Sequence, residues 1–302
     1  MSDQETLSIL MVNYNRLEYL KGTLNSIFEN TIHPYEITIW DNASNEEGVK
    51  EYLQNLNNPN VKVLFSEKNV GVWRASNQLI AQAKNLYTLG FIKLDNDCII
   101  KTKGWETKWI ECCNVNAEVG MLAANIEGKK ERSSDTEMLE LNGHRLLSLT
   151  HEGTGGAVYV PGRVFKQLGF YNEEYGRYGH ADKDYARRAF TLGLKFCYHR
   201  DVEIGRFAVN DNDMTGGYRQ HKNLYVRRNR KVYILNRYLY QHRLRSLAIW
   251  YKKFKDCIAK DILQSASFVW SNDAVLVNKE TGRVSQGVRD KIEQYRLEKV
   301  RK

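Results

Sequence analysis

The chain has 302 residues, of which 42% are hydrophobic and 27% are charged, proportions typical of globular proteins. This composition excludes disorder, collagen and coiled coil as descriptions of the whole chain, and the length suits one large domain or two modest ones. The sequence has no apolar run long enough to cross a membrane, and its polar first residues do not follow the order of a signal peptide. We therefore expect a cytoplasmic protein.

The cysteines indicate a reducing compartment. Their number is odd, two of them are adjacent and no C-x-x-C spacing occurs: Cys98, Cys112, Cys113, Cys197 and Cys257. This spacing predicts neither a disulfide framework nor a structural zinc site.

The positive charge is concentrated near the C-terminus. The net charge is +9, yet thirteen Lys or Arg and a single acid, Asp256, lie between Arg219 and Lys260, so this stretch carries +12 and the remainder −3. Basic segments of this kind commonly contact an anionic surface, such as nucleic acid, phospholipid head groups or a phosphorylated glycan.

The first hundred residues alternate between strand and helix patterns. Strands are predicted at residues 6–12, 36–40, 61–65 and 88–94, and helices at 17–28, 46–56 and 76–84. The alternation predicts an α/β fold, Rossmann-like, with a mainly parallel sheet flanked by helices. Ligands of such sheets bind beyond the carboxyl ends of the strands, so the polar residues there are candidates for chemistry.

The rest of the chain contains a polar insertion, a second strand-and-helix block and a basic C-terminal region. A helix at 105–113 and a strand at 120–124 precede the insertion at 128–153. The second block has a strand at 157–160 and helices at 162–168 and 182–192, and ends near residue 207. We expect residues 1–207 to form one domain and 208–302 a basic helical C-terminal region. Candidate buried positions of that region are Val232, Leu235, Leu239, Leu247, Tyr251, Phe254 and Ile258.

Two carboxylates follow the strand at 88–94. Neither G-x-G-x-x-G nor the P-loop pattern occurs, so a phosphate would have to be held in another way. Asp95 and Asp97 are two residues apart and point to the same side of an extended chain. Their hard oxygens suit Mg²⁺ or Mn²⁺, which commonly bridges to substrate phosphates, although a solvated turn explains the same residues.

An ordered set of motifs resembles the inverting family 2 glycosyltransferases of the GT-A fold. The motifs are Asn13-Tyr14-Asn15-Arg16, Asp41-Asn42-Ala43-Ser44, Asn69-x-Gly71-x-x-x-Ala75-x-Asn77, Asp95-Asn96-Asp97, and the segments 165–175 and 181–188. The resemblance covers about residues 6–205 and leaves the basic C-terminal region unexplained.

The resemblance implies a nucleotide-sugar site at the strand ends. It places Asp41 near the uracil or ribose, and Asp95 and Asp97 at the ribose and the metal. The residues implied along the rest of the donor are Asn13, Tyr14, Asn15, Asn69, Gly71 and Arg74. A divalent ion, Mn²⁺ or Mg²⁺, would stabilise the charge that develops on the leaving diphosphate. The insertion at 128–153 becomes a candidate acceptor loop.

Inverting transfer also requires a base, and Asp182 is the candidate. On a helix, Asp184 points away from Asp182 and toward Arg188 four residues later, which gives Asp184 a structural role. Family members usually carry an acid just before this base, where the present chain has Ala181. His180 is expected to act as a helix cap or packing residue.

A few further residues have either a structural or a functional role. Trp105 and Trp109 are expected in the core. Gly155 and Gly156 either allow close approach of the backbone to a substrate or form a plain turn. His221, after a polar turn, is a possible third metal ligand.

The leading hypothesis is a metal-dependent, inverting glycosyltransferase that moves a sugar from a UDP-sugar to a hydroxyl of a glycan or cell-envelope saccharide. Aromatic residues interleaved with the C-terminal basic residues keep open a second acceptor, a modified base in DNA. A third hypothesis is a non-catalytic nucleic-acid-binding protein on a transferase fold. Peripheral contact with an anionic membrane, at its inner face, is the other interpretation of the basic region.

Overall fold

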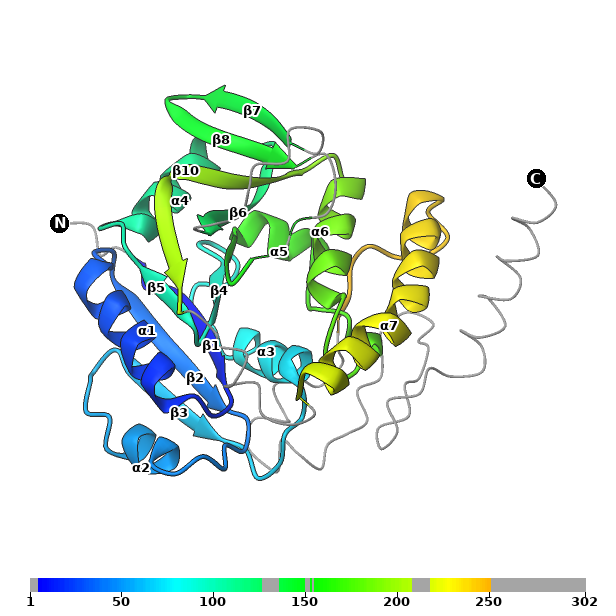
Figure 1. The fold of residues 1–302 in the computed structure, drawn as a ribbon. Helices are drawn as coiled ribbons and strands as arrows, with labels where there is room; N and C mark the ends of the chain where they lie inside the picture. Colours follow the sequence, from blue (N-terminus) through cyan, green and yellow to red (C-terminus); the bar gives the residue numbers. More distant parts are fainter. Residues whose placement is uncertain (1–4, 127–135, 150–152, 154, 208–217, 251–302) are drawn as a thin grey trace.

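The computed structural model describes residues 5–126, 136–149, 153, 155–207 and 218–250, arranged around a ten-stranded sheet (Figure 1). The first half contains β1 (Leu7–Asn13), α1 (Leu17–Asn30), β2 (Tyr35–Asp41), α2 (Val49–Gln54), β3 (Val61–Phe65), α3 (Val72–Ile80), β4 (Phe91–Asp95), β5 (Cys98–Ile100) and α4 (Trp105–Val115). The second half contains β6 (Val119–Ile126), β7 (Thr136–Leu141), β8 (His144–Leu149), β9 (Ala157–Val160), α5 (Gly162–Leu168), the short 3₁₀ helix η1 (Glu173–Tyr175), α6 (Ala181–Thr191), β10 (Lys195–Arg206) and α7 (Tyr218–Gln241).

The sheet is mixed, with the strand order β3-β2-β1-β4-β9-β6-β10-β8-β7 and with β5 paired to β10. Pairing is parallel from β3 to β4, as the alternation predicts. The second half is mixed: β10 pairs parallel with β6, whereas β9 runs antiparallel to both β4 and β6, and β7, β8 and β5 also pair antiparallel.

Two hydrophobic cores cover the two faces of the sheet. Alternate residues of β1 point to opposite sides: Leu10 joins the core with α3, α5, α6 and α7, and Ile9 and Met11 join the core with α1, α2 and α4. Leu20, Leu24 and Ile27 of α1 are fully buried, and Trp105 and Trp109 of α4 are core residues as expected. Burial on both faces explains why the central strands are apolar throughout.

Three sequence-based expectations need correction. The stretch 128–153 is not a plain insertion, because residues 136–149 form the β7–β8 hairpin that extends the sheet beside β10. β10 and β5 were not predicted; β10 is twelve residues long but mixes charged with apolar positions and contains register shifts against β6. The helix predicted at 76–84 begins at Val72, because Gly71 adopts a φ of 86° and Asn69 accepts its N–H.

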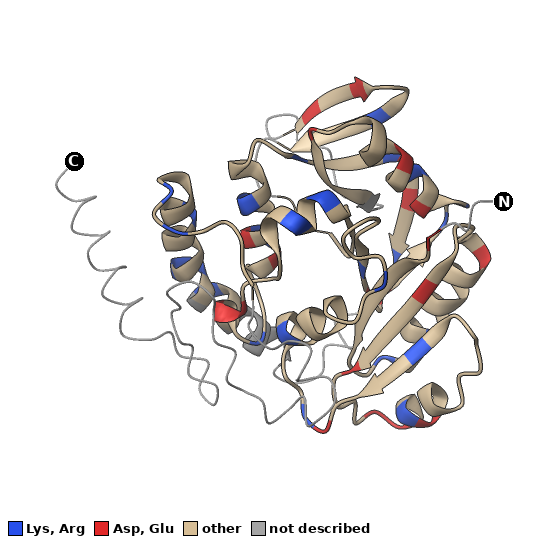
Figure 2. Ribbon diagram, turned by 180° about the vertical axis from the view of Figure 1, so that it is seen from behind, with Lys and Arg blue, Asp and Glu red and all other residues tan. Residues whose placement is uncertain are grey.

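The segment after residue 217 packs onto the α6 side of the sheet. Val232 and Leu235 are buried as predicted, whereas Leu239 and Leu247 are only partly buried. The predicted positions Tyr251, Phe254 and Ile258 lie outside the described residues. Seven of the 24 residues of α7 are Lys or Arg and none is acidic, so the helix carries blue and no red bands in Figure 2.

The four cysteines in the described part of the chain are buried and free. Among the described helices, none has the length and hydrophobicity that crossing a bilayer requires.

A buried arginine joins α6 to its neighbours. The Arg188 Nε donates to Asp184 at 3.0 Å, and both side chains have no exposed surface. The other guanidinium nitrogens donate to the carbonyls of Leu168, Phe170 and Leu247 at 2.7 to 3.0 Å. Asp184 also accepts from the Tyr175 and Tyr240 hydroxyls. One ion pair therefore connects α5, η1, α6, α7 and the segment after α7.

Replacing Arg188 with alanine is expected to lower the free energy of unfolding by about 3–5 kcal/mol, because Asp184 and three carbonyls lose a buried partner. Chemical denaturation measures this change. Lys183→Ala, at an exposed position of the same helix, is the matched control and should change stability by less than about 0.5 kcal/mol. A loss below about 1 kcal/mol for Arg188→Ala would contradict this role.

Candidate active site

The carboxyl ends of β1, β2 and β4 lie side by side, as predicted. The parallel register pairs Asn13 with Asp41 and Val12 with Asp95. The buried Asn13 amide donates to Asp41 at 3.0 Å and accepts from Asn96 at 2.7 Å. Asn13 thus ties the three strand ends together, a structural part in addition to the donor-site role that the resemblance implies.

The loop after β1 has an unusual backbone conformation. Asn15 and Arg16 both adopt positive φ values, 56° and 64°. Their left-handed conformation is held by Ser44, which accepts the Asn15 N–H at 2.8 Å, and by Glu46, which accepts the Arg16 N–H at 2.6 Å. This turn directs the Arg16 guanidinium to Asp97, and leaves Tyr14 about one-third exposed.

The second and third motifs form one hydrogen-bonded unit. Asp41 is buried and accepts from both the hydroxyl and the N–H of Ser44. Asn42 donates to Asn69 at 3.1 Å, and Asn69 in turn accepts from the N–H of Gly71. A side chain at Gly71 would come within 2.6 Å of the backbone of residue 177, so glycine is required there.

Asp95 and Asp97 lie among three cationic side chains. Asp95 contacts the Lys93 ammonium through one oxygen and the Arg206 guanidinium, at 2.9 Å, through the other. Asp97 contacts Arg16 at 3.3 Å and Arg206 at 3.7 Å. Asp95 remains one-third exposed, whereas Asp97 is nearly buried. Burial favours the neutral amine of Lys93, but Asp95 and then Asp182 outweigh it and raise the pKa of Lys93.

One carboxylate oxygen of this cluster lacks a hydrogen bond. Within the described part of the chain, Asp97 Oδ1 is buried and has no hydrogen-bond partner. A buried acceptor without a donor is costly, and a hard cation would satisfy it. The residues present therefore fit a divalent ion held by Asp95 and Asp97.

Sequence reasoning missed Lys93 and Arg206. Arg206 ends β10, the strand that was not predicted, and Lys93 lies inside β4, where it looks like an interruption of an apolar run. Gly156 makes room for Arg206, since a Cβ there would lie 2.6 Å from its guanidinium and 2.9 Å from the Cys98 Sγ. The close approach expected at this glycine is thus to a protein side chain.

Asp182 is half-buried at the start of α6 and accepts only its neighbour's N–H, from Lys183 at 2.9 Å, among the contacts described. Burial raises the pKa of this carboxyl, and Lys183's N–H and the Lys93 charge oppose the rise. Burial, and then the charges of Asp95 and Asp182, raise the pKa of Tyr178 to about 12. Asp182 therefore interacts electrostatically with the same residues as Asp95.

The neighbours of Asp182 have structural roles, as predicted. Asp184 faces Arg188. His180 occupies the N-cap position of α6 without a side-chain capping bond, stacks on Tyr233 at 5.3 Å and contacts the Val226 carbonyl at 3.1 Å. The side chain of His221 lies outside the described residues.

Arg74 and Asn77 connect α3 to the second half of the domain. Arg74 Nε donates to Glu173 at 3.1 Å. Asn77 exchanges two hydrogen bonds with the Tyr171 backbone and donates to Glu173 at 3.0 Å. Arg74 and Asn77, within the motif that begins at Asn69, thus hold η1 against α3.

Comparison with known families decides the classification. Residues 8–111 match the family described as glycosyl transferase family 2. Residues 8–111 are thus similar to family 2 glycosyltransferases. The match contains the strand ends of β1, β2 and β4 with Asn13, Asp41, Asp95 and Asp97. None of the curated proteins compared with the chain matches it significantly.

Solved structures show the fold of the glycosyltransferase domain. GalNAc-T7 in complex with UDP, GalNAc and Mn²⁺ matches with a TM-score of 0.55 and 17% identity, over 67% of this chain and 43% of that one. The mannosyltransferase PcManGT from Pyrobaculum calidifontis, in complex with GDP-Man and Mn²⁺, matches with a TM-score of 0.50 and 14% identity, over 80% of this chain and 65% of that one. The predicted GT-A fold is confirmed. The chain spans less than two thirds of either neighbour.

The fit of Arg206 against Gly156 leads to a stability prediction. Gly156→Ala should lower the free energy of unfolding by about 1–3 kcal/mol through overpacking, because the new methyl group displaces the guanidinium. In an Arg206→Gln background the same substitution should cost at least about 0.5 kcal/mol less. A double-mutant cycle by chemical denaturation measures this coupling, and strictly additive costs would contradict the contact.

Proposed function

We propose that this chain is a metal-dependent, inverting glycosyltransferase that moves a sugar from a UDP-sugar to a saccharide hydroxyl. The observation that carries the proposal is the cluster of Asp95 and Asp97 with Lys93, Arg206 and Arg16 at the carboxyl end of the sheet, where the charge of Asp182 also acts on Lys93. This edge is where open α/β sheets bind ligands. The family match and the nucleotide and Mn²⁺ complexes of the neighbours support the same assignment.

The donor nucleotide is proposed to lie along the ends of β1, β2 and α3. Asp41 and Asn13 present buried polar atoms for the base or ribose. Gly71 packs against the backbone of residue 177 at the start of α3. Asn69, Tyr14, Asn15 and Arg74 are proposed to border the same edge. UDP is preferred over other nucleotides on the resemblance of the motifs to the family.

Asp95 and Asp97 would hold the divalent ion, Mn²⁺ or Mg²⁺, which supplies Lewis-acid stabilisation of the leaving diphosphate when bound. Arg206 and Lys93 supply further positive charge to the same site. Both already contact the carboxylate pair, so the cluster carries three positive charges, with Arg16, against two negative ones. The excess positive charge favours a bound diphosphate and the charge that develops on it.

Asp182 is proposed to take the proton from the acceptor hydroxyl. Its carboxylate oxygens are not bound by any described cationic side chain, whereas Asp184 is fully engaged by Arg188. Burial makes Asp182 a stronger base than an ordinary aspartate. The N–H of Lys183 and then the charge of Lys93 oppose this rise in the pKa of Asp182.

The acceptor is proposed to be a hydroxyl of a glycan or cell-envelope saccharide. Exposed basic residues on α7, Arg227, Arg230 and Lys231 among them, favour an acceptor or carrier with negative charge. A modified base in DNA is the second candidate, supported by this charge and by the aromatic residues interleaved with it.

Asp182→Asn is expected to lower kcat by about 100- to 10,000-fold while leaving the affinity for the donor nearly unchanged, since the amide cannot accept the proton. UDP release from a UDP-sugar in the presence of Mn²⁺ and an acceptor measures the rate. Lys183→Gln, at the adjacent exposed position, is the matched control. Full activity of Asp182→Asn would remove the assignment of the base.

The pH profile tests the same residue. A base works in its ionised form, so activity should rise with pH through the pKa of Asp182 and be lost below it. Because burial raises this pKa, the acidic limb of kcat should have its midpoint above 3.8, the ordinary aspartate value. A profile that stays flat down to that value would contradict a base in this environment.

A further inference from the structure

Three metal-binding residue types meet far from the strand-end site. Cys112 of α4, His144 of β8 and His199 of β10 each offer one ligand atom, and these atoms lie within 4.8 Å of one another. Cys112 and His199 are buried, and His144 is half-buried. Spacing in the sequence does not reveal this cluster, because its members come from three separate segments of the chain.

The two histidine rings already have a separation suited to a shared metal. His144 Nδ1 lies 3.1 Å from His199 Nε2. Two nitrogen ligands of tetrahedral Zn²⁺ are about 3.3 Å apart when each bond is about 2.0–2.1 Å. The rings are steeply inclined, at 78°, so a metal can lie in the plane of each. A small shift of Cys112 Sγ toward them completes three ligands.

Polar neighbours hold these residues in place. Asn116 donates to Cys112 Sγ at 3.7 Å, a contact that favours a thiolate. Asn142, in the β7–β8 turn, donates to Asn116 at 2.7 Å and to the Val115 carbonyl at 3.0 Å, which fixes the hairpin to the end of α4. Hydrogen bonds around the ligands are a regular feature of protein metal sites.

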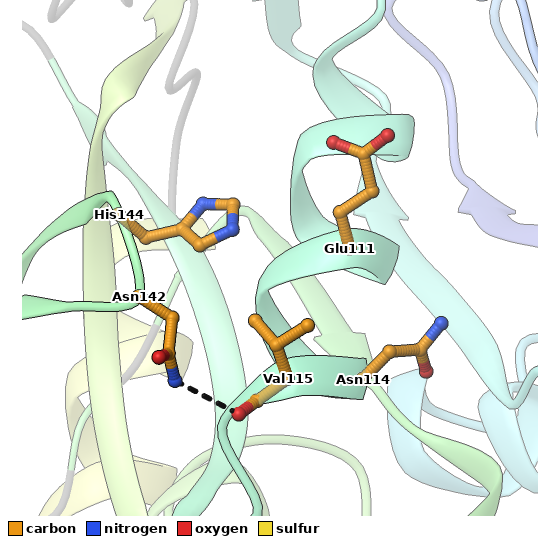
Figure 3. A pocket seen from close by; sticks show the side chains of 5 residues that line it. All are labelled: Glu111, Asn114, Val115, Asn142 and His144. Atoms are coloured by element: carbon orange, nitrogen blue, oxygen red, sulfur yellow. Dashed lines mark hydrogen bonds between the residues drawn. The ribbon is translucent and has the colours of Figure 1, made fainter.

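A pocket gives access to the cluster from solvent. It has a volume of about 750 Å³ and lies between α4 and the hairpin, where His144 faces the helix (Figure 3). Its lining residues are Glu111, Asn114, Val115, Asn142 and His144. A water molecule can therefore serve as a fourth ligand beside His144.

We propose that Cys112, His144 and His199 bind Zn²⁺ and so fasten the β7–β8 hairpin to α4 and β10. A thiolate with two imidazoles is a ligand set typical of zinc and poorly suited to Mg²⁺ or Ca²⁺. The proposal does not depend on the proposed transferase activity, because none of the three residues contacts the Asp95–Asp97 cluster in the described contacts.

Binding has a defined proton balance. The Cys112 thiol loses its proton to solvent as the S–Zn bond forms, so one proton is released per ion. His199 binds through Nε2 in place of its hydrogen bond to His144, and its remaining proton resides on Nδ1. The long 3.3 Å contact from the Asp201 N–H to Nδ1 is given up.

The test uses the full-length chain, incubated with Zn²⁺, desalted and analysed by mass spectrometry for metal content. We expect about one zinc per chain, and a zinc affinity that falls by more than about 100-fold in His144→Gln and Cys112→Ser. Co²⁺ in place of Zn²⁺ should give a thiolate-to-cobalt charge-transfer band in the wild type that is absent in Cys112→Ser. His33→Gln, at a surface histidine, is the matched control and should bind as the wild type does.

One further variant and one fold control identify the site. Asp97→Asn should keep its zinc, which separates this cluster from the carboxylate pair. His144→Gln changes a half-buried ring, and circular dichroism without metal should show the wild-type fold. Absence of bound zinc in the wild type, absence of the cobalt–thiolate band, or zinc binding unchanged in His144→Gln would each overturn the proposal.

Discussion

The buried ion pair of Arg188 and Asp184 is the constraint on which the position of α6 depends. Its guanidinium links α6 to the carbonyls of Leu168, Phe170 and Leu247, and Asp184 links it to the hydroxyls of Tyr175 and Tyr240. An unpaired charge here would be expensive, so these segments must assemble together. Asp182 lies only two residues from Asp184, so the proposed base is placed by contacts that include residues well beyond 207. The segment after β10 is thus part of what positions the site.

Charge balance governs the other half of the site. Asp95 and Asp97 lie close together at the end of β4, and Lys93, Arg206 and Arg16 offset their repulsion. These three cations come from the strand interior, the end of β10 and the left-handed turn after β1. The site consequently needs the whole sheet edge, including Gly156, whose lack of a side chain leaves room for Arg206. The same cations give a positive environment suited to a diphosphate.

The sequence predicted the parallel half of the sheet and the polar strand ends, because β1 to β4 follow a regular alternation and three of them, β1, β2 and β4, end in Asn or Asp. It also predicted the pairing of Asp184 with Arg188, which rests on helical spacing alone. It did not predict β10, the β7–β8 hairpin or the antiparallel orientation of β9 between β4 and β6, since these depend on pairing between distant segments. Lys93 and Arg206 were missed for the same reason: only the folded sheet brings them to the carboxylates. The cluster of Cys112, His144 and His199 is likewise visible only in three dimensions.

Calorimetric titration with UDP, with and without Mn²⁺, tests the central claim most directly: that the edge formed by β1, β2 and β4 is a metal-dependent nucleotide-sugar site. The account predicts UDP binding that requires Mn²⁺, that is stronger than binding of GDP, CDP or TDP, and that is lost in Asp97→Asn. Absence of binding to every nucleotide, or UDP binding that is the same with and without Mn²⁺ and in Asp97→Asn, would contradict it.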